Sequence, residues 1–168
     1  MGSGDEIVTI VDKTNQPIGT SPRRKMRAER LIHRAAYVLV FDSRGRLLIQ
    51  KRTPDKDIYP GYYDVAAGGV VLAGESYEEC AAREAKEELG IINTPLTGHF
   101  NFYFEDERGR VWGRVFSCTH DGPFTLQREE IESGEFMDVG DVLKEKIKPL
   151  TPDTLLALSR YLQKQKPQ

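Results

Sequence analysis

Residues 68–91 read GGVVLAGESYEECAAREAKEELGI, and the rest of the chain is organised around this stretch. Ser76 is a favoured N-cap residue, and Glu79 three positions later completes a capping box. No proline or glycine interrupts residues 77–89, and Gly90 then supplies a stop signal. The stretch therefore predicts a helix of about four turns at 3.6 residues per turn.

One face of this helix is expected to be acidic. Glu84, Glu87 and Glu88, called here the acidic trio, are spaced i, i+3 and i+4, so their carboxylates share a face. Cys80, Ala81 and Ala85 lie on or beside this face, which indicates that the trio points at the protein body. Clustered carboxylates repel one another and lose solvation when partly buried, so we expect a cation among them.

The residues around the trio suit a hard cation. Mg²⁺ prefers oxygen ligands and usually keeps waters and substrate phosphates in its shell. Arg83, four residues before Glu87, is placed to orient it, and Gly68-Gly69 allow a backbone carbonyl to come close. For the trio alone, an ordinary glutamate-rich surface helix is the simpler account. The complete spacing from Gly69 through Glu75 to the end of the stretch is far more specific.

The complete pattern resembles the Nudix box, G-x5-E-x7-R-E-U-x-E-E-x-G-U, where U is a bulky aliphatic residue. Every fixed position is present, and the one departure is the smaller Ala85. The resemblance implies a loop–helix–loop that binds Mg²⁺ or Mn²⁺ and hydrolyses a nucleoside diphosphate linked to another moiety. It implies metal binding by the trio with the carbonyl of Gly68, and a role for Arg83 in holding the glutamates. Glu87 is our first choice for an essential ligand that also serves as base.

A second resemblance is to the isopentenyl-diphosphate-isomerase-like branch of bacterial Nudix hydrolases. It rests on short matches at His33-Arg34, Arg52-Thr53, Lys56, Pro60-Gly61 and Trp112-Gly113. Isomerase catalysis requires a cysteine and a histidine in the strand before the box helix, and residues 64–69 read DVAAGG. Isomerase activity is therefore not expected, and His33 is expected to be a packed or surface histidine.

Composition sets the broad class of protein. The chain has 168 residues, of which 30% are charged and 39% hydrophobic, and its net charge is -2. These values predict a single soluble domain and do not favour a nucleic-acid partner. We expect no membrane span, since no apolar run is long enough. With two cysteines in no metal-binding spacing, a cytoplasmic location is the simplest inference, and homodimerisation is left open.

Short strands and helices are predicted on both sides of the box helix. Before it we expect a hairpin in residues 6–20, a short helix from Ser21-Pro22 to about Arg30, and strands over residues 35–41, 47–52 and 65–69. The first two of these strands are expected to form a second hairpin. After it we expect strands over residues 96–104, 111–119 and 134–138, a short helix to about residue 146 and a final helix over residues 151–163.

This order, with the resemblance, predicts an α+β fold of the Nudix type, an α/β/α sandwich with a mixed sheet. Residues 1–32 are expected to form a hairpin and short helix packed on the domain. Residues 33–163 would be the Nudix hydrolase domain, and residues 164–168 a frayed tail.

Substrate contacts are harder to assign from the sequence. Arg52 and Lys56 begin a loop suited to binding a diphosphate, although surface charge is an equal alternative. The basic segment of residues 23–30 is interpreted first as a solvated helix face and second as a rim that attracts an anion. Tyr62, Tyr63 and Trp112 are candidates for stacking on a base or for packing. Six acids outside the box remain open as alternative bases: Glu105, Asp106, Glu107, Glu129, Glu130 and Glu132.

The partner is therefore expected to be a small nucleotide-diphosphate substrate of undefined leaving group. A non-catalytic nucleotide-binding sensor is the main alternative function, and an isomerase is a weaker one.

Overall fold

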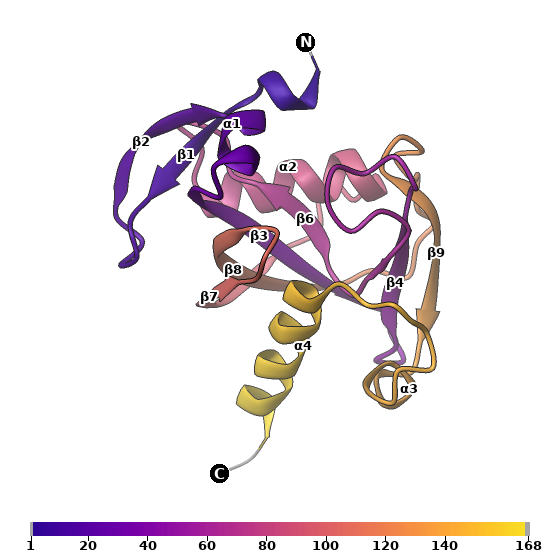
Figure 1. Ribbon diagram of the computed structural model, residues 1–168. Helices are drawn as coiled ribbons and strands as arrows, with labels where there is room; N and C mark the ends of the chain where they lie inside the picture. The colour runs from indigo at the N-terminus through magenta and orange to yellow at the C-terminus, as the bar shows by residue number, and fades with distance from the viewer. Residues whose placement is uncertain (1, 167–168) are drawn as a thin grey trace.

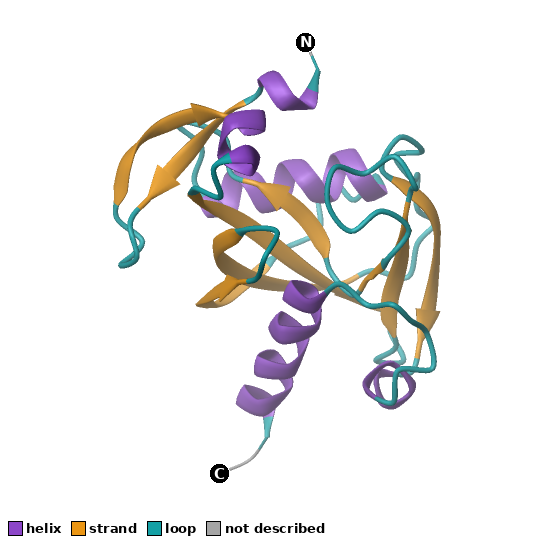
Figure 2. Cartoon of the chain, in the orientation of Figure 1, coloured by secondary structure: helices purple, strands orange, loops and turns teal. Residues whose placement is uncertain are grey.

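The computed structural model describes residues 2–166, and its helices lie on both sides of a mixed sheet (Figures 1 and 2). The elements are η1 (Ser3–Asp5), β1 (Ile7–Val11), β2 (Pro17–Pro22), α1 (Arg23–Ala28), β3 (Ile32–Phe41), β4 (Leu47–Arg52), β5 (Tyr63–Asp64), β6 (Ala67–Val70), α2 (Tyr77–Leu89), β7 (Thr97–Glu105), β8 (Arg110–Thr119), β9 (Ile131–Met137), α3 (Val139–Leu143) and α4 (Pro152–Gln165). This is the predicted α+β sandwich.

Strand β3 is the centre of the sheet. It pairs in parallel with β8 from Ile32↔Arg110 to Phe41↔Thr119, and antiparallel with the short strand β6. Strand β7 pairs with the far side of β8, whereas β9 pairs with β4. Because β6 leads directly into the loop before α2, the pairing of β6 with β3 fixes where the box helix begins.

The two faces of β3 supply two separate cores. Ala36, Val38 and Val40 pack toward α2, in a cluster that includes Cys80 and Leu89. The intervening residues Ala35, Tyr37 and Leu39 belong to the other cluster, with Ala157 and Leu158 of α4. This alternation follows from the two-residue period of a strand, and it seats one helix on each face (Figure 1).

The predicted hairpin of β3 and β4 forms, but its ladder is short. Only Phe41 and Leu47 are paired across the turn. Beyond it the strands diverge, and β4 pairs instead with β9 from Leu47↔Met137 to Arg52↔Ile131. The strands diverge because β3 already has β6 and β8 as partners, which leaves β4 free to carry its loop toward the box helix.

The N-terminal hairpin of β1 and β2 packs against the body through a third cluster. Val8, Ile10 and Met26 meet Val70 there. Two backbone bonds extend the contact, from Thr9 N–H to the Val71 carbonyl at 3.3 Å and from Ala73 N–H to the Ile7 carbonyl at 2.9 Å. The turn of the hairpin is held through polar contacts, since Arg34 donates to the Asn15 side chain at 2.8 Å and Trp112 donates to the Lys13 carbonyl at 3.1 Å.

Several predicted boundaries were wrong. Strands β3 and β9 begin at Ile32 and Ile131, each three residues before the predicted start. Ser21 and Pro22 lie in β2, not in the helix, and α1 begins at Arg23 without a side-chain cap. The final helix continues to Gln165, so Lys164 and Gln165 are helical and not part of a frayed tail. Lys166 of that predicted tail is the C-cap of the helix, and residues 167–168 lie outside the described residues. Within residues 2–166 no helix is long and apolar enough to cross a membrane.

Candidate active site

The box helix α2 has the predicted ends. The Ser76 hydroxyl accepts from Glu79 N–H at 3.0 Å, and the Glu79 carboxylate accepts from Ser76 N–H at 3.2 Å, which completes the capping box. Gly90 ends the helix in the left-handed conformation with φ 71°. Ala85, the smaller residue in the box, is almost fully buried beside Leu89. These local signals fix the rotation of the helix and thereby the direction of its glutamates.

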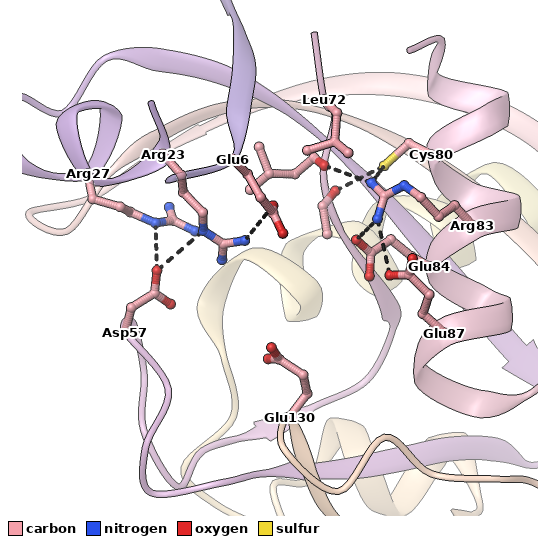
Figure 3. Close-up of polar contacts among 12 residues, drawn as sticks. Glu6, Arg23, Arg27, Asp57, Leu72, Cys80, Arg83, Glu84, Glu87 and Glu130 are labelled. Atoms are coloured by element: carbon pink, nitrogen blue, oxygen red, sulfur yellow. Dashed lines mark hydrogen bonds and ion pairs between the residues drawn. The ribbon is translucent and has the colours of Figure 1, made fainter. Parts of the chain in front are cut away.

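Arg83 is the hub of a carboxylate network (Figure 3). It donates to both oxygens of Glu75 at 2.6 and 3.0 Å, to Glu84 at 2.8 Å and to Glu87 at 3.3 Å. A further bond at 3.3 Å reaches the Val70 carbonyl, at the end of β6. Hydrogen bonding to Glu75 raises the pKa of Arg83, so its charge is permanent. The guanidinium thus ties the loop before the helix to two members of the trio.

Gly68 and Gly69 form the floor beside Glu84. A Cβ on Gly68 would lie 1.9 Å from the Ala36 carbonyl oxygen, and its φ of 141° is one that other residues rarely adopt. A Cβ on Gly69 would lie 2.6 Å from Glu84 Oε1. Only glycine at both positions lets β6 pass between β3 and the carboxylate of Glu84.

The trio differs in exposure along the helix. Glu84 and Glu88 are partly buried, whereas 49% of the Glu87 side chain is exposed. Burial, together with the nearby negative charge of Glu84, raises the pKa of Glu88 well above its usual range. Two close carboxylates in a poorly solvated place favour either a shared proton or a cation.

One pocket brings these residues together. It has a volume of about 170 Å³, and its lining includes all seven residues predicted for the site: Arg52, Lys56, Gly68, Arg83, Glu84, Glu87 and Glu88. The end of β4, loop 53–62, β6 and α2 supply them, so residues more than thirty positions apart in the chain face one space.

Arg52 and Lys56 already have protein partners. Arg52 donates to Asp64 at 2.8 Å and to the Ile58 carbonyl at 2.8 Å, which shapes the loop that follows β4. The Lys56 ammonium is paired with Glu130 from the segment before β9. Both cations line the pocket, and Arg52 makes more hydrogen bonds to the protein than Lys56 does.

Only some of the acids outside the box helix line the pocket, and none of the three aromatic candidates does so among the described residues. Of the six alternative bases, Asp106 and Glu130 line the pocket. Both carboxylate oxygens of Asp106 already accept hydrogen bonds, one from the backbone N–H of Arg108 at 2.8 Å and the other from the Tyr59 hydroxyl. The stacking candidates Tyr62, Tyr63 and Trp112 are absent from the lining among the described residues, and Tyr63 packs in the α4 core.

A buried polar group missed by the sequence analysis lies at the back of the pocket. The Tyr37 hydroxyl donates to Asp153 Oδ2 at 2.8 Å, while Asp153 Oδ1 is buried without a hydrogen bond among residues 2–166. Burial, with the charge of Asp64 close by, raises the pKa of Asp153. Neither residue belongs to a local motif, and only the packing of α4 on β3 brings them together.

Comparison with known proteins identifies the family to which the chain belongs. Residues 31–158 match the NUDIX domain family, and the chain belongs to this family of hydrolases. An uncharacterized Nudix hydrolase of Yersinia pestis is 51% identical over 157 residues, which cover 94% of this chain and 86% of the relative. The uncharacterized Nudix hydrolase YfcD of Escherichia coli K12 is 44% identical over 159 residues, covering 95% and 88%. The chain is therefore a Nudix hydrolase, an enzyme.

Solved structures share the fold at lower identity. DR0079 of Deinococcus radiodurans superposes with a TM-score of 0.78 at 24% identity, covering 93% of this chain and 99% of that one. The NUDIX domain of Shewanella oneidensis NrtR, solved with ADP ribose, gives a TM-score of 0.63 at 16% identity, covering 80% and 88%. These likenesses support the architecture.

Proposed function

We propose that the protein is a divalent-metal-dependent hydrolase that cleaves a phosphoanhydride bond in a nucleoside diphosphate linked to another moiety. The observation that carries the proposal is the placing of Glu84, Glu87 and Glu88 beside Gly68 in one pocket. These oxygen donors suit Mg²⁺ or Mn²⁺. The raised pKa of Glu88 supports the same view, since the site carries more negative charge than it can solvate.

The proposed metal set requires one local rearrangement. Among residues 2–166, no three His, Cys, Asp or Glu side chains are arranged to hold a metal ion as they stand. Arg83 holds Glu87 at 3.3 Å, and the half-exposed Glu87 side chain is free to turn from it toward Glu88. Arg83 would keep Glu84 in place through the 2.8 Å contact and remain anchored by Glu75.

The protein's own groups would then bind and orient the substrate. A bound Mg²⁺ or Mn²⁺ would neutralise the charge that develops on the phosphate oxygens. Lys56 offers a positive charge to the diphosphate at the mouth of the pocket, while Arg52 shapes the loop that carries Lys56. Glu87 remains our first choice for the group that accepts a proton from the attacking water.

Glu130 is the best-placed alternative base. It lines the pocket, and its interaction among the described residues is the ion pair with Lys56. Figure 3 shows its carboxylate pointing up toward the space between α1 and α2. A substrate phosphate that draws Lys56 away would leave Glu130 free to accept a proton, a role that the occupied Asp106 cannot fill.

Isomerase chemistry has no support in the pocket. Its lining within the described residues contains no cysteine, and Cys80 points into the core, where its thiol lies 3.3 Å from the Gly69 carbonyl. His33 lines the pocket but is 4% exposed. We therefore propose that the chain shares short sequence matches with the isomerase-like hydrolases but does not catalyse isomerisation.

The test is a phosphate-release screen with and without Mg²⁺ or Mn²⁺. It covers nucleoside di- and triphosphates, nucleotide sugars, dinucleotides, coenzyme A and isopentenyl diphosphate. Glu87→Gln alters a ligand charge without removing volume, so we expect a folded protein with turnover reduced by about 10²-fold or more. Glu78→Gln, on the solvent side of the same helix, is the matched control and should keep activity. Metal-independent turnover, or a fully active Glu87→Gln variant, would contradict the proposal.

A further inference from the structure

A second charged cluster faces the pocket from the N-terminal segment. Arg23 and Arg27 lie one turn apart on α1, outside residues 31–158 that match the NUDIX domain, yet both line the pocket. Figure 3 shows them on the opposite side of the space from Arg83 and Glu84. A positive wall therefore faces an acidic wall across one cavity.

Most donors of this positive wall are unused in the part of the chain that the structure describes. The one hydrogen bond runs from Arg27 Nε to Asp57 Oδ2, at 3.3 Å. Arg23 Nε lies 3.5 Å from the same oxygen but is buried without a hydrogen bond, and its Nη1 lies 3.8 Å from Glu6. A guanidinium carries a planar fork of N–H donors, so both side chains have several left for a ligand.

The positive charges of the wall are also poorly solvated. The exposed side-chain fractions of Arg23 and Arg27 are 16% and 21%, against 69% for Arg24 on the same helix. The carboxylates that face them, Glu6 and Asp57, are about two-fifths exposed. Burial lowers the pKa of Arg27, Asp57 opposes the change, and Arg23 adds to it. An incoming anion would supply the charge-assisted hydrogen bonds that water no longer gives these two guanidiniums.

Building on the proposed hydrolysis at the acidic trio, we propose that Arg23 and Arg27 form a subsite for a phosphate monoester at the far end of the substrate. Guanidinium forks match phosphate oxygens with paired, charge-assisted hydrogen bonds. The scissile diphosphate is assigned to the metal and the trio, so the anion at α1 is a separate group. The substrate class is thus a diphosphate compound that carries a further phosphate.

Direct binding tests the subsite without any turnover. We would titrate inorganic phosphate into the protein by calorimetry in EDTA, where the uncompensated trio repels anions. Glu87→Gln should bind phosphate at least as tightly as wild type, because it removes one repelling charge, and the double variant Arg23→Gln/Arg27→Gln should lose about tenfold or more in affinity. Arg24→Gln is the matched control on the same helix and should bind as wild type does. Equal affinity in the double variant, or acetate binding as strong as phosphate binding, would overturn the proposal.

A variant that should raise phosphate affinity keeps the proposal testable even if the double variant does not fold. Glu6→Gln removes a carboxylate that competes for Arg23, and its own side chain is 42% exposed. Phosphate should then bind several-fold more tightly than in wild type. Glu29→Gln, whose partner Lys25 lies on the exposed side of α1 at 3.8 Å, is the control and should bind phosphate like wild type. No gain in Glu6→Gln counts against the subsite.

Matched substrates separate the subsite from the reaction. Coenzyme A and dephospho-coenzyme A differ by one phosphate monoester, as do NADP and NAD. For any pair that is hydrolysed, the double variant should raise KM for the phosphorylated member by about tenfold and leave kcat and the other member nearly unchanged. Hydrolysis with an unchanged KM ratio overturns the subsite and leaves the hydrolase intact. Phosphate binding in EDTA with no hydrolysis of any compound supports the subsite and contradicts the proposed reaction.

Discussion

At the scale of single residues, the two glycines of the floor have different tasks. Gly68→Ala would drive a Cβ into the Ala36 carbonyl at a φ of 141°, so it should cost more than about 4 kcal/mol of folding free energy. Gly69→Ala would meet the carboxylate of Glu84, which is the end of a flexible side chain. This variant should fold and lose about 10²-fold in turnover, because Glu84 is displaced.

Thermal unfolding and metal-dependent turnover, measured on both variants, check this pair. Gly140→Ala is the control, since a Cβ there meets nothing within 4 Å. A stable Gly68→Ala protein, or an active Gly69→Ala enzyme, would contradict the assignment of the two positions.

His33 makes a prediction about pH. Burial, reinforced by Arg27 and opposed by the Leu31 carbonyl, lowers the pKa of His33 to about 3. In the unfolded chain the pKa is about 6.5, so between these values only the unfolded state binds the proton. Stability therefore falls as pH falls through this window. His33→Gln lacks the proton site, so wild type should lose about 2 kcal/mol more than the variant between pH 7 and pH 5.

Chemical denaturation at the two pH values measures this difference. Equal pH dependence in wild type and variant would mean that His33 is protonated in the folded protein, and therefore open to water or paired with an acid.

Residues near one another in sequence were the ones that could be assigned. The relative positions of Arg83, Glu84 and Glu87 follow from spacing within one helix, since i, i+1 and i+4 positions have fixed relations. Arg27 was interpreted first as part of a solvated face, because a basic helix gives no local sign of which side is covered. Asp153 had no signal, as its surroundings are made by strands and loops far away in the chain.

At the scale of elements, the box helix depends on its N-terminal cap. Ser76→Ala removes the bond to Glu79 N–H and should cost about 1 kcal/mol, or about 2–4 °C in Tm. The acidic trio lies toward the other end of the helix, so kcat should change little. Ser133→Ala, at an exposed position of β9, is the control. A loss of activity larger than the loss of stability would show that the cap also positions the trio.

Elements with strong ends were predicted almost to the residue, and the hairpin of β1 and β2 was predicted too, whereas pairings between distant strands were not. Helix α2 has a cap, an uninterrupted run and a glycine stop, all readable locally. The parallel ladder of β3 and β8 joins Ile32 to Arg110, which are 78 positions apart. No local pattern sets such a register, and the same ladder explains why β4 leaves β3 after one pair.

At the scale of the whole molecule, the N-terminal hairpin should unfold together with the NUDIX domain. Val8 is fully buried against Val70 and Met26, so Val8→Ala should cost about 2 kcal/mol. Calorimetry should give a single transition at lower Tm, since β1 is bonded to residues 71–73 as well as to β3. Ile18→Ala, at a site 65% exposed on β2, should leave Tm unchanged. A second, earlier transition in Val8→Ala would mean that residues 1–32 are an independent unit.

Both thiols of the chain are withdrawn from solvent, which has a practical consequence. Cys80 is inaccessible and Cys118 is 7% exposed. Burial raises the pKa of Cys118 to about 11, and burial next to Glu84 raises that of Cys80 further. Since the thiolate is the reactive form, alkylating reagents should leave the native protein unlabelled at neutral pH. A single cysteine introduced at Arg24, on the exposed side of α1, would then accept one fluorophore beside the pocket and report its occupancy.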